Sequence, residues 1–496
     1  MSARSRLRRV AVAAAAVTLV PAFASGATAS GADEPPSTPV PITTPDGLLM
    51  SYVLNAKHAN HGQLKKVEAA VERADGVIIQ SWAQIGVVVA HSENDTFRAD
   101  VSEYAGTALE SVGATRSVAV SEGTPGVDGS GTRHGEQKVE GEVGTEETTA
   151  VVPDPREGEQ WDMRMIKADQ AHEVTDGSRA VLVGVLDSGI DPDHPDLAPN
   201  IDTDESVNCT DAGRLDRSAT GWHPTTSDHG THVAGTIAAE RNGQGLVGVA
   251  PGARMASVKV VNDDGFIYPE YAVCGFVWAG LRGMDVTNNS YYVDPFMYYC
   301  EDQPDQYAAK EAVRRAVEWS THRGVVHAAA AGNAATDLSN NTVDTTSPDD
   351  GTPVNRTINS GCEDIPTELD GVVTVSSMQQ FPANSGESRL SSFSNRGLGE
   401  IDVAAPGSSI LSTIVNGNGY GLKSGTSMAS PHVAGVLALM KSAHPNWSPK
   451  RMIEQIRVQA DDKACGTTTA GPACVGPVED NSYFGEGVVD ALDAVS

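Results

Sequence analysis

The stretch Ser-Gly-Thr-Ser-Met-Ala-Ser-Pro-His-Val-Ala-Gly, residues 424–435, is the most informative part of this chain. Apolar residues recur at positions 429, 433, 436, 437 and 440, a spacing that predicts a buried helix beginning near Ser427. A serine at the start of such a helix has an exposed hydroxyl, and its backbone N–H lies at the positive end of the helix dipole. A nucleophilic serine needs both properties, although an ordinary N-cap serine shows the same local pattern.

Two further segments place a carboxylate and an imidazole in comparable positions. Val183 to Leu186 is a β-branched, apolar run that predicts a buried strand, and Asp187 follows it directly before Ser-Gly. Open parallel sheets place functional groups at this end of a strand, whereas an isolated Asp before Ser-Gly is more often a turn residue. His229 opens His-Gly-Thr-His-Val-Ala-Gly, again at the predicted start of a small-residue helix.

These three segments resemble the signature motifs of the subtilisin-like serine proteases, the subtilases, in the Asp…His…Ser order of that family, and the resemblance runs from about residue 155 to the C-terminus. It implies an α/β fold, a doubly wound and mostly parallel sheet with helices on both faces. It also implies that Ser427 attacks the peptide carbonyl, His229 transfers the proton and Asp187 orients the imidazole. The family places a side-chain oxyanion donor where this chain has Asn333, so Asn333 and the Ser427 N–H are assigned to the oxyanion hole.

The resemblance also identifies candidate substrate-binding residues. Ser290 and Tyr292 lie in the segment that usually reads Asn-x-Ser-Leu-Gly and forms one wall of the primary specificity pocket. Tyr292 stands where the family has glycine, and its ring is expected to narrow or reshape the pocket. Gly265 and Phe266 match an edge strand that pairs with the substrate backbone. Ala334 is uncharged where some relatives carry Glu, which favours an apolar or small pocket.

A zinc site is the alternative use of the histidines. His229 and His232 have the spacing of two zinc ligands on one helix face. However, no Glu follows the first His, and no third ligand cluster is evident in the sequence. We therefore expect His232 to pack within the motif helix and His432 to be structural, and we expect no cofactor for catalysis.

A structural calcium ion is implied by the spacing from His229 to Pro251, which equals that of relatives with a calcium loop. Oxygen ligands suit this hard cation, and the ion would serve stability and not chemistry. A simple turn at Asn242-Gly243 is the alternative. The implied ligands are the side chains of Asp196 and Asn242 and the backbone carbonyls of Glu240, Gln244 and Leu246.

The beginning of the chain reads as a targeting segment. Residues 1–30 combine a basic start, a short apolar core and small residues at two cleavage points, after Ala24 and after Ala29. The apolar run is too short to span a bilayer as a stable helix. We expect a secretory signal peptide, an extracellular protein and no membrane anchor.

Residues 31–121 predict a small unit ahead of the protease. Their βαββαβ order, with the last strand near Val118 to Val120, suits an α+β ferredoxin-like fold. Position and order resemble the propeptide domain of subtilases, which assists folding and inhibits the active site; a binding domain retained in the mature protein is the alternative. Residues 122–157 are rich in Gly, Glu, Thr and Pro and predict a flexible linker that contains the maturation site, followed by the peptidase domain at 158–496.

The composition limits which binding partners and which cellular compartment can be expected. With 65 acidic and 35 basic residues the formal net charge is −30, which argues against binding to nucleic acid or to anionic membranes. Six cysteines in an exported chain predict three disulfides out of fifteen pairings, with free buried thiols as the alternative. Cys465–Cys474 is the most local pair, and the resemblance places Cys209 near Cys274 and Cys300 near Cys362.

The sequence therefore predicts a secreted serine endopeptidase that is made as an inactive precursor, acts on protein or peptide substrates, is inhibited by its own propeptide and is a monomer. The Asn-Asn-Ser-Tyr-Tyr segment is similar to proteases of the lanthipeptide leader-processing group, which raises a dedicated processing enzyme as the alternative to a general scavenger. An inactive peptide-binding relative is the alternative of another class, and the intact candidate site argues against it. A lipase is excluded because its catalytic residues follow the opposite chain order.

Overall fold

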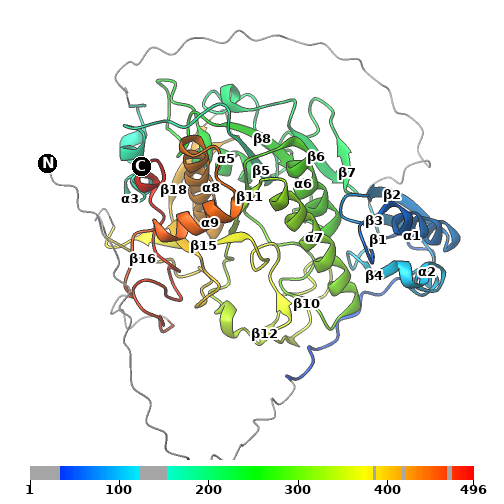
Figure 1. Ribbon diagram of the computed structural model, residues 1–496. Coiled ribbons are helices and arrows are strands. Elements are labelled where there is room, and N and C mark those ends of the chain that lie inside the picture. Colours follow the sequence, from blue (N-terminus) through cyan, green and yellow to red (C-terminus); the bar gives the residue numbers. More distant parts are fainter. Residues whose placement is uncertain (1–33, 122–152, 384–386, 416, 418, 466–471) are drawn as a thin grey trace, which may run out of the picture. The chain divides into compact units, whose positions relative to one another are not determined.

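The strand Leu182–Asp187, in the middle of the central sheet, is an apolar run that is buried on both faces. The computed structural model describes residues 34–121, 153–383, 387–415, 417, 419–465 and 472–496 (Figure 1). In the strand that ends at Asp187, Leu182 and Leu186 pack into one buried cluster, and Val183 and Val185 pack into another. Both faces of the strand are covered, which explains why its sequence does not alternate between apolar and polar residues.

The nine-stranded sheet has the order β16-β15-β11-β9-β5-β8-β6-β7, with β17 also paired to β15. All pairings are parallel except those of the edge strands β7 and β16, so the predicted doubly wound, mostly parallel sheet is confirmed. The strands are β5 Leu182–Asp187, β6 Val207–Asp211, β7 Arg214–Asp216, β8 Arg254–Lys259, β9 Val286–Asn289, β11 Val326–Ala330, β15 Val372–Gln380, β16 Ser388–Leu390 and β17 Val403–Pro406.

Helices cover both faces of this sheet (Figure 1). Helices α6 and α7 contribute to the cluster that contains Leu186, whereas α5 and α8 contribute to the cluster that contains Val185. As predicted, helices begin near Ser427 and at His229. Ser448 caps a late helix by accepting a hydrogen bond from Arg451 N. The bounds are α3 Trp161–Met165, α4 Ala168–Ala171, α5 His229–Ala238, α6 Pro269–Arg282, α7 Pro304–His322, α8 Thr426–Ala443, α9 Pro449–Val458 and α10 Ala491–Ala494, with 3-10 turns η2 Glu157–Glu159, η3 Ala198–Asn200 and η4 Leu338–Asn340. Within the described ranges, no helix is long and apolar enough to cross a membrane.

The N-terminal unit has the predicted βαββαβ order and an antiparallel sheet in the order β2-β3-β1-β4, which is the ferredoxin-like arrangement. Its elements are β1 Met50–Ala56, α1 His61–Arg73, β2 Gly76–Trp82, β3 Val87–Ser92, α2 Phe97–Ala105, η1 Gly106–Ala108 and β4 Leu109–Ala114. The predicted signal peptide and residues 122–152 of the predicted linker lie outside the described residues.

The position predicted for the last strand of this unit was wrong. The strand is β4, at Leu109–Ala114, whereas Val118 is 41% exposed. The segment Leu-Glu-Ser-Val-Gly-Ala lacks the run of β-branched residues that marks a strand in sequence. It is a strand because it pairs with β1 and packs against α7.

The sheet of the N-terminal unit packs on α7 of the protease through a close backbone approach. A Cβ built on Gly113 of β4 would lie 2.7 Å from Asp305 Cα and 2.9 Å from Ala308 Cβ. Ala114 N donates to Asp305 Oδ1 at 2.9 Å, and Asn55 Nδ2 donates to Ala308 O at 2.9 Å. Both bonds reach the first turns of α7, so glycine at position 113 allows the two elements to meet.

Three disulfides match the expected pairs, and no free cysteine is found in the described part of the chain. Cys209–Cys274 joins β6 to α6, and Cys300–Cys362 joins the two-stranded pair β10 Tyr299–Cys300 and β14 Cys362–Glu363. Cys465–Cys474 closes a local loop. Two further strand pairs are β12 Val343–Asp344 with β13 Arg356–Thr357, and β18 Ile410–Ile414 with β19 Gly419–Lys423.

We expect Gly113→Ala to destabilise the precursor by about 1–3 kcal/mol, because the new methyl group would press on the backbone of α7. The measurement is thermal or urea unfolding of full-length protein carrying Ser427→Ala, which lacks the candidate nucleophile. Gly62→Ala in α1 is the matched control, since a Cβ there meets nothing nearer than 3.6 Å. Equal stability of the two variants would contradict the close seating of β4 on α7.

Candidate active site

Asp187 and His229 form a hydrogen-bonded pair at the end of β5. His229 Nδ1 lies 2.9 Å from Asp187 Oδ1 and 3.0 Å from its Oδ2. The carboxylate is 1% exposed, and Ser188 N donates to its Oδ1 at 2.7 Å. The strand end and the helix start therefore bring together the two residues that the sequence motifs singled out.

The pairing depends on the glycine that follows His229. A Cβ built on Gly230 would lie 2.5 Å from Gly189 O and 3.1 Å from Asp187 Oδ1. Any larger residue would push the start of α5 away from the end of β5. The motif therefore requires glycine after the histidine for steric reasons.

The charge of Asp187 acts on the imidazole. Burial lowers the pKa of His229, but the negative charge of Asp187 and its hydrogen bond outweigh burial, so the pKa is raised above the ordinary 6.5. Asp187 therefore stabilises the imidazolium that forms when the ring accepts a proton.

Ser427 lies in the first turn of α8. Its Oγ donates to Ser290 O at 3.2 Å, and Ser290 Oγ donates to Ser427 O at 2.9 Å. In the described part of the chain, no hydrogen bond joins Ser427 to His229, and the imidazole bonds through Nδ1. Catalytic hydrogen bonds are often long or unformed without substrate.

Asn333 and the N–H of Ser427 lie on either side of Gly425. Asn333 Oδ1 accepts hydrogen bonds from Thr426 N at 2.8 Å and from Thr426 Oγ1 at 3.0 Å. Because its oxygen is held in this way, the amide presents Nδ2 as its free donor. A Cβ built on Gly425 would lie 3.6 Å from Ser427 N and 3.7 Å from Asn333 Nδ2, so both donors border one space. Two donors in this arrangement suit an oxyanion.

A cavity of about 440 Å³ opens beside Ser427 and Asn333. Every residue predicted to bind substrate lines it: Ser290, Tyr292, Gly265, Phe266 and Ala334. The remaining lining residues are Ile267, Tyr291, Asp294, Met297, Ala330, Gly332, Asp349, Asp364 and Thr426.

Two expectations for this cavity were wrong. Gly265 and Phe266 do not form an edge strand, because Asn262 closes a turn on them: Phe266 N donates to Asn262 Oδ1 at 2.9 Å, and Asn262 N donates to Phe266 O at 3.0 Å. The pocket is also not simply apolar, although Ala334 is uncharged. Three carboxylic acids line it, and the hydroxyl of Tyr292 donates to one of them, Asp349, at 2.7 Å.

Sequence reasoning missed these three acids, Asp294, Asp349 and Asp364. They stand in irregular segments, before Pro295, within Pro-Asp-Asp and after Cys-Glu, and none belongs to a motif. The bond of Cys300 to Cys362 was a usable signal, because it draws the segment of Asp364 toward the segment of Met297.

Residues 178–486 match the sequence profile of the Subtilase family. The chain belongs to this family. It is 33% identical to Subtilisin E of Bacillus subtilis (strain 168) over 334 residues, which are 67% of this chain and 70% of that protein. It is accordingly a serine endopeptidase, and a subtilase needs no cofactor for catalysis.

Two solved structures share the fold. The crystal structure of fervidolysin from Fervidobacterium pennivorans, described as a keratinolytic enzyme related to subtilisin, has a TM-score of 0.64 and 23% identity; the match covers 90% of this chain and 61% of that chain. The epidermin leader peptide processing serine protease of Staphylococcus aureus has a TM-score of 0.64 and 21% identity, covering 90% of this chain and 98% of that chain. At these identities the likeness shows the fold alone.

His232 and His432, the two histidines expected to be structural, are both buried. His232 is buried in α5, where its Nε2 lies 3.1 Å from Ile410 O, and burial lowers its pKa to about 4. His432 is buried in α8, with Nδ1 2.8 Å from Met428 O and Nε2 3.0 Å from Asp162 Oδ2. Among the residues that the structure describes, no group of three or more His, Cys, Asp or Glu is arranged to hold a metal.

The residues predicted to bind calcium do not fit the ion. Asp196 is fully buried and accepts hydrogen bonds from Tyr420 OH at 2.9 Å and from Leu246 N and Asn242 Nδ2 at 3.3 Å each. Asn242 thus turns its amide nitrogen toward Asp196, while its oxygen accepts from Gln244 N at 2.9 Å. An amide nitrogen is no ligand for a hard cation, and protein donors satisfy the carboxylate instead. The alternative, a hydrogen-bonded turn at Asn242-Gly243 shortly after Glu240, fits these contacts better than a calcium site does.

We expect a chelator to leave the melting temperature of the protein unchanged and Tyr420→Phe to destabilise it by about 1–3 kcal/mol, because the buried Asp196 would lose a donor. The control is Tyr307→Phe, which removes an exposed hydrogen bond to Glu110 and should change stability little. Thermal unfolding with and without EDTA gives both results. A clear drop in melting temperature on chelation would contradict the hydrogen-bonded assignment.

Proposed function

We propose that the chain is a secreted serine endopeptidase, made as an inactive precursor, that cleaves peptide bonds through Asp187, His229 and Ser427. The observations that carry the proposal are the bond from His229 Nδ1 to the buried Asp187 and the position of Ser427 and Asn333 on the wall of one cavity. The three disulfides and the predicted signal peptide support export. We propose a monomer, with neither a metal nor a nucleic acid as partner.

In the acylation step, Ser427 Oγ attacks the substrate carbonyl carbon while His229 Nε2 takes the hydroxyl proton. Ser427 first exchanges its hydrogen bond to Ser290 O for one to the imidazole. The negative charge that develops on the carbonyl oxygen is stabilised by Ser427 N–H and Asn333 Nδ2. His229 then gives the proton to the leaving amine, which leaves the acyl group on Ser427.

In the deacylation step, water takes the place of the amine. His229 removes a proton from the water, the resulting hydroxide attacks the acyl carbon, and the same oxyanion donors stabilise the second intermediate. The proton returns to Ser427 Oγ as the ester bond breaks. Asp187 stays ionised throughout and keeps the Nδ1–H of His229 oriented.

The N-terminal unit is proposed to be the inhibitor in the precursor. Its residues after β4 run beside the substrate cavity: Arg116 pairs with Glu270 and lies 3.8 Å from the ring centre of Tyr268, and Ser117 N donates to Asp350 Oδ2 at 2.8 Å. Asp350 follows directly after the cavity residue Asp349. A segment held at this rim excludes a substrate chain from the same surface.

A dedicated processing enzyme is the second candidate, in place of a general scavenger. The fold is shared with a leader peptide processing protease, and the substrate cavity contains Tyr292 and three carboxylic acids in place of a plain apolar lining. A lining of this kind selects among side chains. A peptide-library cleavage profile separates the two candidates, since a broad profile would exclude the dedicated enzyme.

We expect the wild-type secreted protein to lose its N-terminal region and to be labelled by a fluorophosphonate at Ser427. The Ser427→Ala variant should keep that region and take no label, because it lacks the nucleophile. Intact-mass spectrometry of both proteins measures the two outcomes. If the folded wild type takes no label, the inactive peptide-binding relative replaces the protease.

We expect Asp187→Asn to lower kcat by about 10⁴-fold and to move the acidic limb of kcat/KM to lower pH. The sign follows from the pKa of His229, which Asp187 raises; without that charge, burial dominates and the imidazole loses its proton at lower pH. Asp228→Asn is the control, because Asp228 contributes least to the raised pKa and pairs with Lys423. An unshifted limb in Asp187→Asn would contradict the assigned role.

A further inference from the structure

Three carboxylic acids line the cavity beside Ser427. Asp364 is 1% exposed and Asp294 is 4% exposed, and both line the cavity together with Asp349. Asp294 Oδ2 accepts from Ile267 N, and Asp349 Oδ2 accepts from Tyr292 OH at 2.7 Å. These bonds satisfy one oxygen each of Asp294 and Asp349, and all three carboxyl groups line the same cavity.

Two of the carboxyl oxygens have no partner. Among the described residues, no N–H group or hydroxyl donates a hydrogen bond to Asp364 Oδ1 or to Asp349 Oδ1, and no ion pair involves these acids. The carboxyl group of Asp349 meets that of Asp294, which is itself an acid. A buried oxygen of this kind destabilises the empty cavity and favours a ligand that donates hydrogen bonds to it. Asp364 Oδ2 lies 3.7 Å from a Cβ built on Gly332, so this carboxyl faces the wall that also carries Asn333.

The pKa values of two of these acids are raised by burial and by neighbouring acids. Burial, followed by the nearby Glu368, raises the pKa of Asp364 well above its ordinary value. Burial, followed by Asp349, does the same for Asp294. A cation that entered the cavity would favour their ionised forms and bind to them in return.

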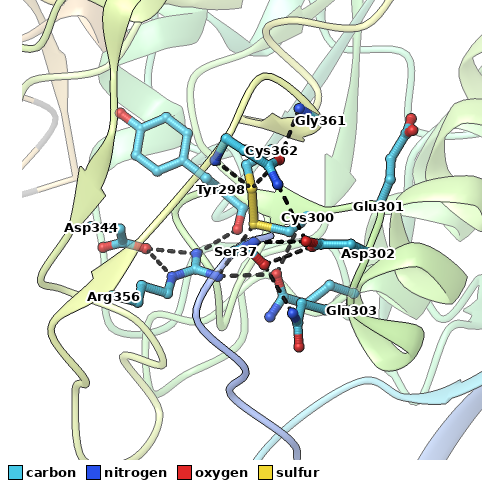
Figure 2. Close-up of a disulfide and its surroundings, with 12 residues drawn as sticks. Ser37, Tyr298, Cys300, Glu301, Asp302, Gln303, Asp344, Arg356, Gly361 and Cys362 are labelled. Atoms are coloured by element: carbon cyan, nitrogen blue, oxygen red, sulfur yellow. Dashed lines mark hydrogen bonds and ion pairs between the residues drawn. A yellow bond between two sulfur atoms is a disulfide. The ribbon is translucent and has the colours of Figure 1, made fainter. Parts of the chain in front are cut away.

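The position of Asp364 is fixed by the disulfide shown in Figure 2. The bond of Cys300 to Cys362 joins β10 to β14, and Asp364 follows β14 directly. Arg356, the buried cation next to this disulfide, bonds to Asp344 Oδ2 at 2.6 Å and to Tyr298 O, so its charge is already paired (Figure 2). The positive charge of Arg356 is therefore used by Asp344 and does not neutralise Asp364.

We propose that this cavity binds an arginine side chain, that of the substrate residue whose carbonyl carbon Ser427 attacks, and that Asp364 determines this specificity. The proposal rests on the proposed function. The guanidinium has five donors, which match the free oxygens of Asp364 and Asp349, whereas the single ammonium of lysine matches fewer. An apolar side chain would leave the buried acids without partners, so it is disfavoured.

The test uses peptide substrates that differ only in this residue, with arginine, lysine, leucine, phenylalanine or alanine. Fluorophosphonate labelling of Ser427 first counts the active enzyme. We expect kcat/KM for arginine to exceed that for leucine by at least about 10²-fold, since a site built for a polar group strongly rejects an apolar one. Labelled enzyme that prefers a neutral residue overturns the inference alone, whereas unlabelled enzyme overturns the proposed function.

The residue is tested by Asp364→Asn, which should lower the arginine-to-leucine ratio by about 10²-fold and weaken competitive inhibition by benzamidine to a similar degree. Glu363→Gln is the matched control, because Glu363 is the neighbouring residue, pairs with Lys310 outside the cavity and should keep the ratio. Asp349→Asn, with an expected loss of about 10-fold, carries the test if Asp364→Asn does not fold. An unchanged ratio in the folded variants overturns the assignment.

Discussion

The burial of β5, β9 and β11 on both faces is the constraint on which the rest of the structure depends. Because the two faces are covered by helices, a polar side chain inside these strands needs a buried partner, as Thr287 finds in His327. The three strands are neighbours and run parallel, so their carboxyl ends meet at one edge of the sheet. Asp187 closes β5, Ser290 follows β9 and Asn333 follows β11, and α8 adds Ser427 from the covering layer. The candidate active site is therefore assembled at the sheet edge and not on any single loop.

The sequence allowed most of this framework to be predicted, because apolar runs and glycine-flanked polar residues mark strand ends and helix starts. It also allowed the order of the N-terminal unit to be predicted, since α1 and α2 have clear helical spacing. The last strand of that unit was misplaced because β4 packs on another part of the protein, and local pattern says nothing of such a contact.

The acidic residues of the cavity were the part of the candidate site that the sequence did not predict. Tyr292 and Ala334 were correctly placed on its wall from motif position, yet the acids across from them belong to irregular segments brought in by chain folding. The turn at Asn262 was also missed, because a side-chain hydrogen bond to the Phe266 N–H closes it. Catalytic motifs are local in sequence, whereas a pocket is assembled from distant segments, and this difference explains why one was predictable and the other was not.

The interface between the N-terminal unit and the protease contains ion pairs as well as closely packed backbone. Glu270 of α6 is fully buried against Arg116, and Asp305 of α7 bonds to Arg98 at 2.7 Å. Burial raises the pKa of Glu270, but the charge of Arg116 outweighs it and holds that pKa below its ordinary value. Removal of the unit would leave both carboxylates in water without their cations, so the shortened chain would lack part of the attraction that assembled it. The folded state of the shortened chain would then last only as long as its unfolding is slow. Its lifetime would be set by the unfolding rate and not by the free energy of unfolding.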